Sequence, residues 1–481
     1  MGPACRQTEG NSEPREDPMH LRPLTVSLLS VLISGCHFVL EQAATESAPD
    51  AGTASSGGPA PSEAPPAAGA TPVAVVPTAP EVLPVATPSS GKAHVAAIAV
   101  GGAHVCALSP QGAVACWGAN ESGQLGYAHP WDIGDDEPPT DAGLVDVGGT
   151  VVALVAGARH TCALLSANRI RCWGNGSDLA LGRGDSHPQT IGDDETPAEA
   201  GDAIIYASAP FQALAAGNQH SCTLTAKGSV KCWGSSPAGA LGYGFATKTG
   251  GWLGEVPLGK TVAIALEAGC DHTCALLQGG DVRCWGHAPA LGTGGVDNVG
   301  DDEAPTAVGV LDLGEPVVQL AAGDRHTCAL TAQGAVRCWG MGGFGALGTG
   351  KTHSAPHAAE AAVVQLGEVV TRIAAGHRHT CALTLSGAVR CWGDGAHGAL
   401  GYGNTLSVGD DEPPAAAGAV QLGESAVQID AGDGFTCALL QSGVVRCWGL
   451  GLRGRLGSGA EASIGDDEVP AGSAPIAVFA P

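Results

Sequence analysis

The chain has 481 residues and a formal net charge of −25, from 22 Lys and Arg against 47 Asp and Glu. This charge excludes an ordinary nucleic-acid-binding protein, because contact with a phosphate backbone needs a basic surface. The length alone would suggest about three domains, but an internal repeat takes precedence over that estimate.

Residues 1–35 are predicted to be a leader. The residues before Met19 are polar and show no folding pattern, so Met19 is the expected translation start. His20 and Arg22 precede an apolar run, Leu24–Ile33. A short charged segment followed by such a run is typical of a secretory signal, and the run is too short to span a bilayer as a helix.

The run ends in Ile33-Ser34-Gly35-Cys36, which resembles the lipobox of bacterial lipoproteins. The resemblance implies cleavage before Cys36 and acylation of that residue. The mature protein would then be exported and anchored to the cell envelope, at the outer membrane or the cell surface. The alternative is an ordinary secretory peptide with an incidental cysteine, which would give a secreted protein.

Residues 36–92 are predicted to be a disordered tether. They are rich in Ala, Pro, Ser, Gly and Thr, as in Ala51–Ala70, AGTASSGGPAPSEAPPAAGA. Such a composition buries too little apolar surface to fold. Its root-mean-square reach would be on the order of 40 Å, enough to hold a folded domain away from a membrane.

Residues 93–481 contain seven copies of one segment, such as Ala322–Gly340, AGDRHTCALTAQGAVRCWG. The runs on either side of Gly334 alternate in hydrophobicity, which indicates two strands joined by a hairpin turn. This register places Cys328 opposite Cys338, close enough for a disulfide bond after a small adjustment. Buried free thiols are the alternative. We predict seven disulfides, one per copy: Cys106–Cys116, Cys162–Cys172, Cys222–Cys232, Cys274–Cys284, Cys328–Cys338, Cys381–Cys391 and Cys437–Cys447.

Each unit offers four short strand candidates, which in the fifth unit are Gly309–Leu313, Val317–Ala321, HTCAL and VRCW. Four strands per unit and seven units predict an all-β fold, a seven-bladed β-propeller. The array starts with a second-strand pattern and ends with a first-strand pattern at Pro475–Phe479. We therefore expect this C-terminal strand to join the blade begun at Ala93 and to close the ring.

The pattern G-x-x-H-T-x-A-L…G-x-V-x-x-W-G…G-x-L-G resembles the repeat of the regulator of chromosome condensation family, and the resemblance covers all of 93–481. It implies a seven-bladed propeller that binds other proteins. Nuclear members act on chromatin and on a small GTPase, so guanine-nucleotide exchange is an alternative function. Two features depart from the family: the paired cysteines, and an acidic insert after most copies.

The insert, Gly-Asp-Asp-Glu, occurs five times, and equivalent loops of a propeller emerge on one face. It predicts either a Ca²⁺ site or a platform for a cationic partner. The spacing matches neither an EF-hand nor the glycine-aspartate nonapeptide of calcium-binding β-helices. We favour a solvated turn, because clustered acidic residues usually form a solvated face. The acidic residues are Asp135, Asp136, Glu137, Asp193, Asp194, Glu195, Asp301, Asp302, Glu303, Asp410, Asp411, Glu412, Asp466, Asp467 and Glu468.

One repeat position holds histidine in six copies and Phe435 in the seventh; the histidines are His104, His160, His220, His272, His326 and His379. Since they lie on separate blades, we expect structural hydrogen bonds rather than metal ligation. Trp131 and Trp252 lie outside the repeat and are either interface anchors or packed over the acidic loops. Cys270 is predicted to be a free thiol or an intermolecular link.

No nucleophile, metal-protease or phosphate-loop motif occurs in the sequence. We therefore predict a non-catalytic, monomeric envelope protein that needs no cofactor and binds a protein or an extracellular polymer through its loops. The basic pair Arg453 and Arg455 receives little weight. A propeller enzyme is a further alternative, and it would need a non-repeating polar cluster at the mouth of the channel.

Overall fold

The computed structural model describes residues 94–184, 189–251 and 253–479. The predicted leader and tether, with Cys36, lie outside these residues, as does Trp252. Within the described ranges, no helix has the length and hydrophobicity needed to cross a bilayer.

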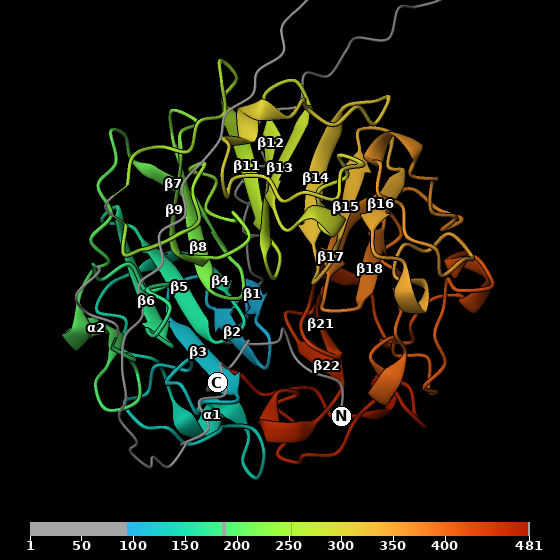
Figure 1. Cartoon of the computed structure of the whole chain (residues 1–481). Coiled ribbons are helices and arrows are strands. Elements are labelled where there is room, and N and C mark those ends of the chain that lie inside the picture. The colour runs from blue at the N-terminus through green and yellow to red at the C-terminus, as the bar shows by residue number, and fades with distance from the viewer. Residues whose placement is uncertain (1–93, 185–188, 252, 480–481) are drawn as a thin grey trace, which may run out of the picture. The chain divides into compact units, whose positions relative to one another are not determined.

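Seven antiparallel sheets follow one another along the chain, one from each copy of the repeat (Figure 1). We call them blades 1 to 7. Blades 1 to 3 consist of β1 Ala97–Val100, β2 His104–Leu108, β3 Val114–Gly118; β4 Val151–Ala156, β5 His160–Leu165, β6 Arg169–Gly174; and β7 Phe211–Ala216, β8 His220–Thr225, β9 Val230–Ser236, β10 Thr247–Thr249. Blades 4 to 7 consist of β11 Ala263–Ala268, β12 His272–Leu277, β13 Val282–Gly286; β14 Val317–Ala322, β15 His326–Thr331, β16 Val336–Gly340; β17 Val370–Ala375, β18 His379–Thr384, β19 Val389–Gly393; and β20 Ala426–Ala431, β21 Phe435–Leu440, β22 Val445–Gly449.

Short helical turns lie in the connections between these strands. The α-helical ones are α1 Pro139–Ala142 and α2 Pro197–Ala200. The 3₁₀ turns are η1 Ala288–Ala290, η2 Pro305–Ala307, η3 Gly343–Gly345, η4 Ala358–Glu360, η5 Ala396–Gly398, η6 Pro414–Ala417, η7 Leu452–Gly454 and η8 Pro470–Gly472.

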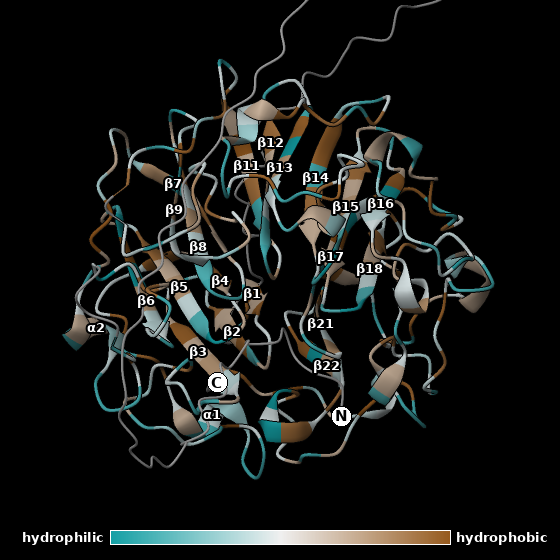
Figure 2. Ribbon diagram, in the orientation of Figure 1, coloured by the Kyte–Doolittle hydropathy of each residue, from teal (hydrophilic) through white to brown (hydrophobic). Residues whose placement is uncertain are grey.

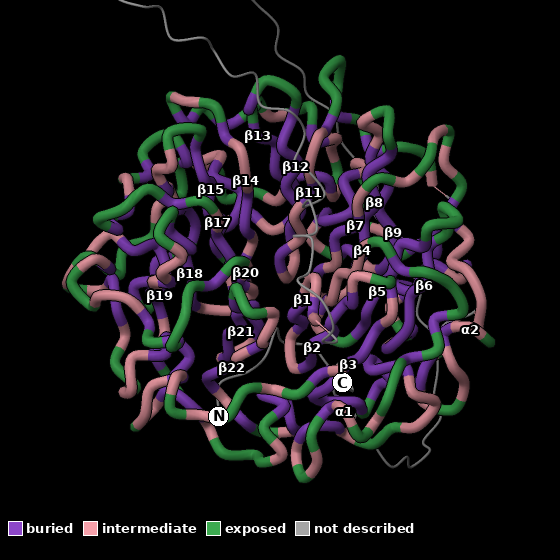
Figure 3. The backbone as a smooth tube through the Cα atoms, turned by 180° about the vertical axis from the view of Figure 1, so that it is seen from behind, coloured by how far each residue is buried: buried purple, intermediate pink, exposed green. Residues whose placement is uncertain are grey.

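The predicted hairpin register is confirmed in every blade. In blade 5, Cys328 pairs with Cys338 and Leu330 with Val336. All seven predicted disulfides are present. Their sulfur-bearing side chains are buried together with the seven tryptophans that follow the second cysteines. Figure 3 shows the strands mostly buried, whereas the exposed residues are concentrated in the connecting loops.

The expected fourth strand is an outer segment that a single backbone hydrogen bond joins to the third strand of its blade. In blade 4, Leu311 N–H donates to the Val282 carbonyl at 2.8 Å. Other carbonyls of the outer segment accept hydrogen bonds from a basic side chain of the third strand. In blade 4, the Arg283 guanidinium donates to the carbonyls of Pro305 and Val308, each at 2.6 Å. The arginine replaces ladder partners, so the segment stays irregular.

The expectation that the C-terminal strand joins the first blade is wrong. Ile476 pairs with Val445, so the segment belongs to blade 7. Each outer segment follows the third strand it binds, and the last one therefore has its partner in its own blade. For the same reason, residues 309–313 belong with blade 4 and not with the blade that follows them.

Backbone hydrogen bonds between blades close the ring instead. The turn linking the first and second strands of each blade, here called the inner turn, binds the inner turn of the next blade. The bonds run from Gly102 N to Gly157 O, Ala158 N to Gly217 O, Asn218 N to Cys270 O, Cys270 N to Gly323 O, Asp324 N to His377 O, His377 N to Gly432 O, and Asp433 N to Gly102 O. The last bond joins blade 7 to blade 1, where β20 also contacts β1.

Candidate functional site

One end of every blade carries the inner turn, the end of the third strand and the following loop. They share that end because the first residue of the second strand pairs with the last residue of the third, as His326 does with Gly340. The loop then returns beside the third strand, as Ile133 does beside Gly118. We call this end of the propeller the inner-turn face. In the hydropathy colouring of Figure 2, both the strands and the connecting loops carry hydrophobic and hydrophilic segments.

A non-repeating polar cluster lies on the inner turns of blades 5 to 7. The Nε2 of His377 lies 3.1 Å from Asp324, and its Nδ1 lies 3.3 Å from Asp433. Burial alone would lower the pKa of His377, but the hydrogen bond and charge of Asp324, together with the charge of Asp433, raise it above the ordinary value. The histidine therefore links three blades and lies between two carboxylates, which favour its protonated form.

Asp324, His377 and Cys270 lie close enough together to suggest a metal site. Cys270, however, is not a free thiol in the structure. Metal binding requires a thiolate, and both nitrogens of His377 already face carboxylates. The predicted free-thiol state of Cys270 is not supported, and the three residues form no ready metal site.

The five acidic loops form joints between neighbouring blades. A Cβ placed on Gly192 would come within 2.2 Å of the Gly123 carbonyl oxygen, in the G-x-L-G turn of the preceding blade. Gly192 also has a φ of 100°, so both the contact and the backbone conformation require glycine. In the loop of blade 1, the Gly134 carbonyl accepts a hydrogen bond from Gly459 N–H of blade 7 at 3.1 Å.

The acidic side chains of these loops form internal contacts. Burial and a hydrogen bond shared with the neighbouring Asp raise the pKa of Glu137 and of Glu195 to about 7. The pKa values of the glutamates at 303, 412 and 468 are raised as well. The middle aspartate of each loop stays exposed. This geometry supports the turn interpretation, while Ca²⁺ binding remains an untested hypothesis.

The two blades without the acidic motif make the same joint with other residues. In blade 3, Gly250 supplies the carbonyl that accepts from Gly184 N–H at 3.3 Å. In blade 5, Pro356 supplies the carbonyl that accepts from Gly294 N–H at 2.9 Å. The contact between these blades therefore requires a backbone carbonyl at this loop position. It does not require the carboxylates of the acidic motif.

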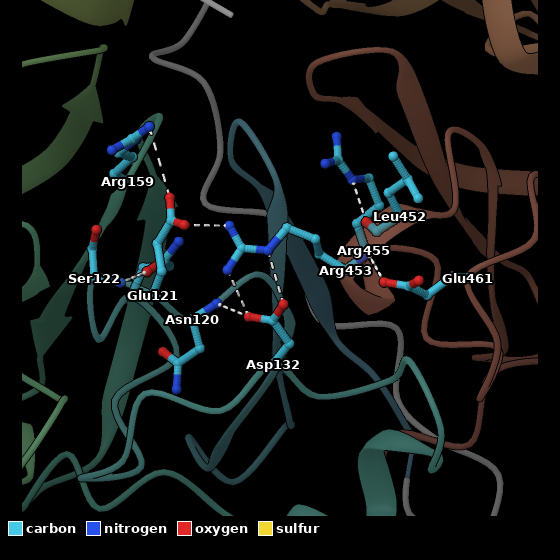
Figure 4. Close-up of polar contacts among 10 residues, drawn as sticks. Asn120, Glu121, Ser122, Asp132, Arg159, Leu452, Arg453, Arg455 and Glu461 are labelled. Carbon is cyan, nitrogen blue, oxygen red and sulfur yellow. Dashed lines mark hydrogen bonds and ion pairs between the residues drawn. The ribbon is translucent and has the colours of Figure 1, made fainter. Parts of the chain in front are cut away.

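Arg453 holds blade 7 to blade 1 on the inner-turn face (Figure 4). Its guanidinium donates to both oxygens of Asp132, at 2.8 and 2.9 Å, and to Glu121 at 2.6 Å. Arg159 approaches Glu121 from the other side at 3.7 Å. The predicted basic spot is thus an ion-pair network rather than a free cationic patch.

Comparison with known proteins identifies the family of this propeller. The regulator of chromosome condensation (RCC1) repeat matches residues 95–124, 151–178, 211–239, 263–288, 317–346, 370–399 and 426–455, and a second model of it matches 111–164 and 333–383. The chain belongs to the RCC1-repeat family.

Three relatives show what the RCC1-repeat chain is similar to. The ultraviolet-B receptor UVR8 of Arabidopsis thaliana is 31% identical over 362 residues, 72% of this chain and 74% of the receptor. The human E3 ubiquitin-protein ligase HERC2 is 32% identical over 273 residues, 54% of this chain but 5% of the ligase. The crystal structure of yeast RCC1 (Prp20) bound to Kap60 matches with a TM-score of 0.60 at 20% identity, over 78% of this chain and 85% of that chain, and shows the fold.

The histidine of the RCC1 repeat signature forms a buried joint between blades. In six blades the histidine lies 2.8–2.9 Å from a Thr or Ser hydroxyl of the next blade, one residue after the position that corresponds to the histidine. Thr380 donates its proton to the Ala346 carbonyl at 3.2 Å, so its oxygen must accept from the Nε2–H of His326. Burial lowers the pKa of the six histidines to about 3 or 4. They are structural, as expected.

The joint between blades 7 and 1 differs on both sides. Phe435 stands where the histidine would be, and Val105 stands where its hydroxyl partner would be. Both side chains are fully buried. The two changes belong together. The apolar ring of Phe435 needs no hydroxyl partner, and a buried hydroxyl opposite it would have no hydrogen-bond partner.

Transferring this apolar pair to another joint tests the assignment. We expect Thr380→Val alone to cost about 2 kcal/mol of unfolding free energy, because it leaves the buried Nε2–H of His326 without an acceptor. The double variant His326→Phe with Thr380→Val should be at least about 1 kcal/mol more stable than the sum of the single effects predicts. Urea unfolding of all four proteins measures this coupling, and strictly additive effects would contradict the joint.

Proposed function

We propose that this protein is an exported, lipid-anchored binding protein that captures a protein partner through its inner-turn face and has no catalytic activity of its own. One observation carries the proposal. The buried histidine and hydroxyl pairs recur in six of the seven blade contacts, whereas the inner-turn face also holds charged residues that occur in one blade only, such as His377 and Arg453. A surface that departs from the repeat is where partner-specific contacts belong.

The disulfides support the exported location. Seven bonds within single hairpins are typical of an oxidising compartment, because cytosolic and nuclear thiols are kept reduced. The same reasoning weighs against guanine-nucleotide exchange and against action on chromatin. Anchoring through Cys36 and a tether over 36–92 is part of the proposal and rests on the sequence pattern.

The polar cluster favours binding over catalysis. A general base must reach a substrate proton with a free nitrogen or oxygen. Both ring nitrogens of His377 face carboxylates, which raise its pKa, so neither nitrogen is free to reach a substrate proton. Its geometry is that of a link between blades 5, 6 and 7. The HERC2 match covers 5% of that ligase, so it gives no ground for assigning ligase activity to this chain.

Site-specific photocrosslinking in intact cells tests the proposal. Phe344 lies on the inner-turn face and is 48% exposed, and Leu385 lies in a hairpin turn at the other end of its blade and is 74% exposed. We expect benzoylphenylalanine at position 344 to form a discrete adduct with a protein, and the same residue at 385 to form none. The adduct should be in the envelope fraction, and Cys36→Ser should release it. Adducts at 385 but not at 344 would refute the proposal.

A further inference from the structure

Trp131 is an unusual exposed aromatic residue on the inner-turn face. It lies in the connection Tyr127–Ile133, YAHPWDI, which leads from the G-x-L-G turn of blade 1 to its acidic loop. The corresponding connections before the other four acidic motifs contain no tryptophan. The side chain is 71% exposed, so it is not packed over the acidic loop, one of the two arrangements that the sequence allowed. Among the described residues Trp131 is the one exposed tryptophan, and the repeat architecture does not explain it.

The connection that carries Trp131 is held in a fixed shape by Asn120, which is fully buried. The Asn120 side-chain amide donates to the His129 carbonyl at 2.5 Å, and its oxygen accepts from Leu125 N–H at 2.9 Å. The Asn120 backbone N–H donates to Asp132 at 2.7 Å. The rings of His129 and Tyr127 stack at 5.9 Å. Trp131 is therefore presented by an ordered loop, which lowers the entropic cost of using it in binding.

A cavity of about 550 Å³ lies beside this tryptophan. Its lining includes Pro130, Trp131, Asp136, Asp141 and Arg453. Arg453 is already bound to Asp132 and Glu121, so its charge is compensated within the protein. Asp136 and Asp141 are exposed, and no ion pair with either is found among the described residues. The cavity thus combines an aromatic wall with uncompensated negative charge.

An aromatic face beside carboxylates is complementary to an organic cation with apolar parts. A guanidinium or ammonium group is attracted by the indole face and by the carboxylates at once, and tryptophan is enriched among the residues that dominate protein interfaces. A metal ion would use the carboxylates and leave the indole without a role. We propose that this cavity receives an arginine or lysine side chain of the protein partner, with its cationic group against Trp131. This inference rests on the proposed function and deepens it.

Fluorine NMR of 5-fluorotryptophan-labelled protein tests the site directly. The Trp131 resonance is assigned with Trp131→Phe and followed during titration with acetyl-arginine-amide. The control ligand is acetyl-citrulline-amide, which has nearly the same shape and no charge. We expect the arginine derivative to shift the Trp131 resonance and the citrulline derivative to leave it unchanged. Equal shifts with both ligands, or no shift with either, would overturn the proposal.

Blade 6 supplies a matched control for the carboxylates. It has the same acidic motif, with Asp411 in the place of Asp136, but Leu406 rather than an aromatic residue in its connection. Asp136→Asn should weaken binding of acetyl-arginine-amide severalfold, and Asp411→Asn, which removes the same charge from the equivalent loop, should leave it unchanged. An equal loss in both variants would show a diffuse effect of charge and overturn the site.

The photocrosslinking experiment separates this inference from the proposed function. With benzoylphenylalanine at position 344, Trp131→Ala is expected to reduce the yield of the adduct. If the yield is unchanged, the inference about the cavity fails while the binding function stands. If no adduct forms in the protein with Trp131 intact, the proposed function fails whatever the NMR titration shows.

Discussion

Reduction of all seven disulfides is expected to unfold the propeller at room temperature. Each bond joins cysteines ten residues apart. In the chain-entropy model, closing a loop of this length stabilises the folded state by about 2.5 kcal/mol. The seven bonds together would contribute roughly 15–20 kcal/mol, whereas the net stability of most domains is about 5–15 kcal/mol. The loss on reduction would exceed the net free energy of unfolding, so the reduced chain is expected to unfold.

The rate of reduction needs separate treatment, because the cysteines are 0–2% exposed. A reductant cannot reach them in the folded protein, so the bonds should survive for a long time under native conditions. The measurement is therefore made by reducing the protein in denaturant, removing the denaturant, and recording circular dichroism with and without reductant. We expect refolding only under oxidising conditions. Recovery of the native spectrum with all thiols reduced would contradict the prediction.

Removal of a single disulfide should lower the unfolding free energy by about that bond's share of the total. Replacing Cys328 and Cys338 together by alanine removes one bond and should lower the unfolding free energy by about 2–3 kcal/mol, without loss of the fold. A much larger loss would mean that the pair acts mainly through packing, since both side chains lie in the core.

The sequence predicts the blades well because their information is local. A glycine turn flanked by two alternating runs sets the hairpin register, and the register places Cys328 opposite Cys338. The outer segments were harder to predict. Their apolar pattern matches a strand, but Arg283 and its equivalents bind carbonyls that a strand would offer to a ladder. An alternating hydrophobic pattern does not reveal that a side chain will bind the carbonyls that a neighbouring strand would otherwise use.

Contacts between blades depend on which residues of distant repeats meet. Asp324, His377 and Asp433 occupy one aligned position in three consecutive copies, so an alignment of the repeats could have brought them together. The replacement of histidine by Phe435 could likewise have been matched to Val105 once the last blade was placed beside the first. The exposure of Trp131 had no such signal, because a loop tryptophan packs or projects according to the shape of its surroundings.

The second large effect is a steep loss of stability in acid. Burial lowers the pKa of the six joint histidines to about 3 or 4, whereas in the unfolded chain they titrate near 6.5. Between these values the unfolded state binds protons that the folded state does not, so stability falls as the pH falls. Each histidine contributes up to about 1.4 kcal/mol per pH unit.

Partly buried carboxyl groups act in the opposite direction over part of this range. The pKa of Asp430 is raised to about 6 and that of Glu267 to about 8, mainly by burial, as the pKa values of Glu137 and Glu195 are raised to about 7. Between their unfolded and folded pKa values the folded state binds the extra protons, so these groups favour the folded state as the pH falls. In the unfolded chain they are fully protonated only below about pH 3, so their opposing effect on stability fades between about pH 4.5 and 3.

Unfolding free energy should therefore change little between pH 7 and 5 and fall steeply below about pH 4.5, with a slope of up to about 8 kcal/mol per pH unit from six histidines. Urea unfolding at closely spaced pH values measures this slope. The variant His326→Phe with Thr380→Val removes one of the six titrating groups and keeps the joint apolar, so its slope should be about one sixth smaller. An unfolding midpoint that is constant from pH 5 to 3.5 would show that the histidines are protonated within the folded ring. The joints would then hold imidazolium groups, whose Nε2–H still donates to the neighbouring hydroxyl, and the lowering of the histidine pKa values by burial would be wrong.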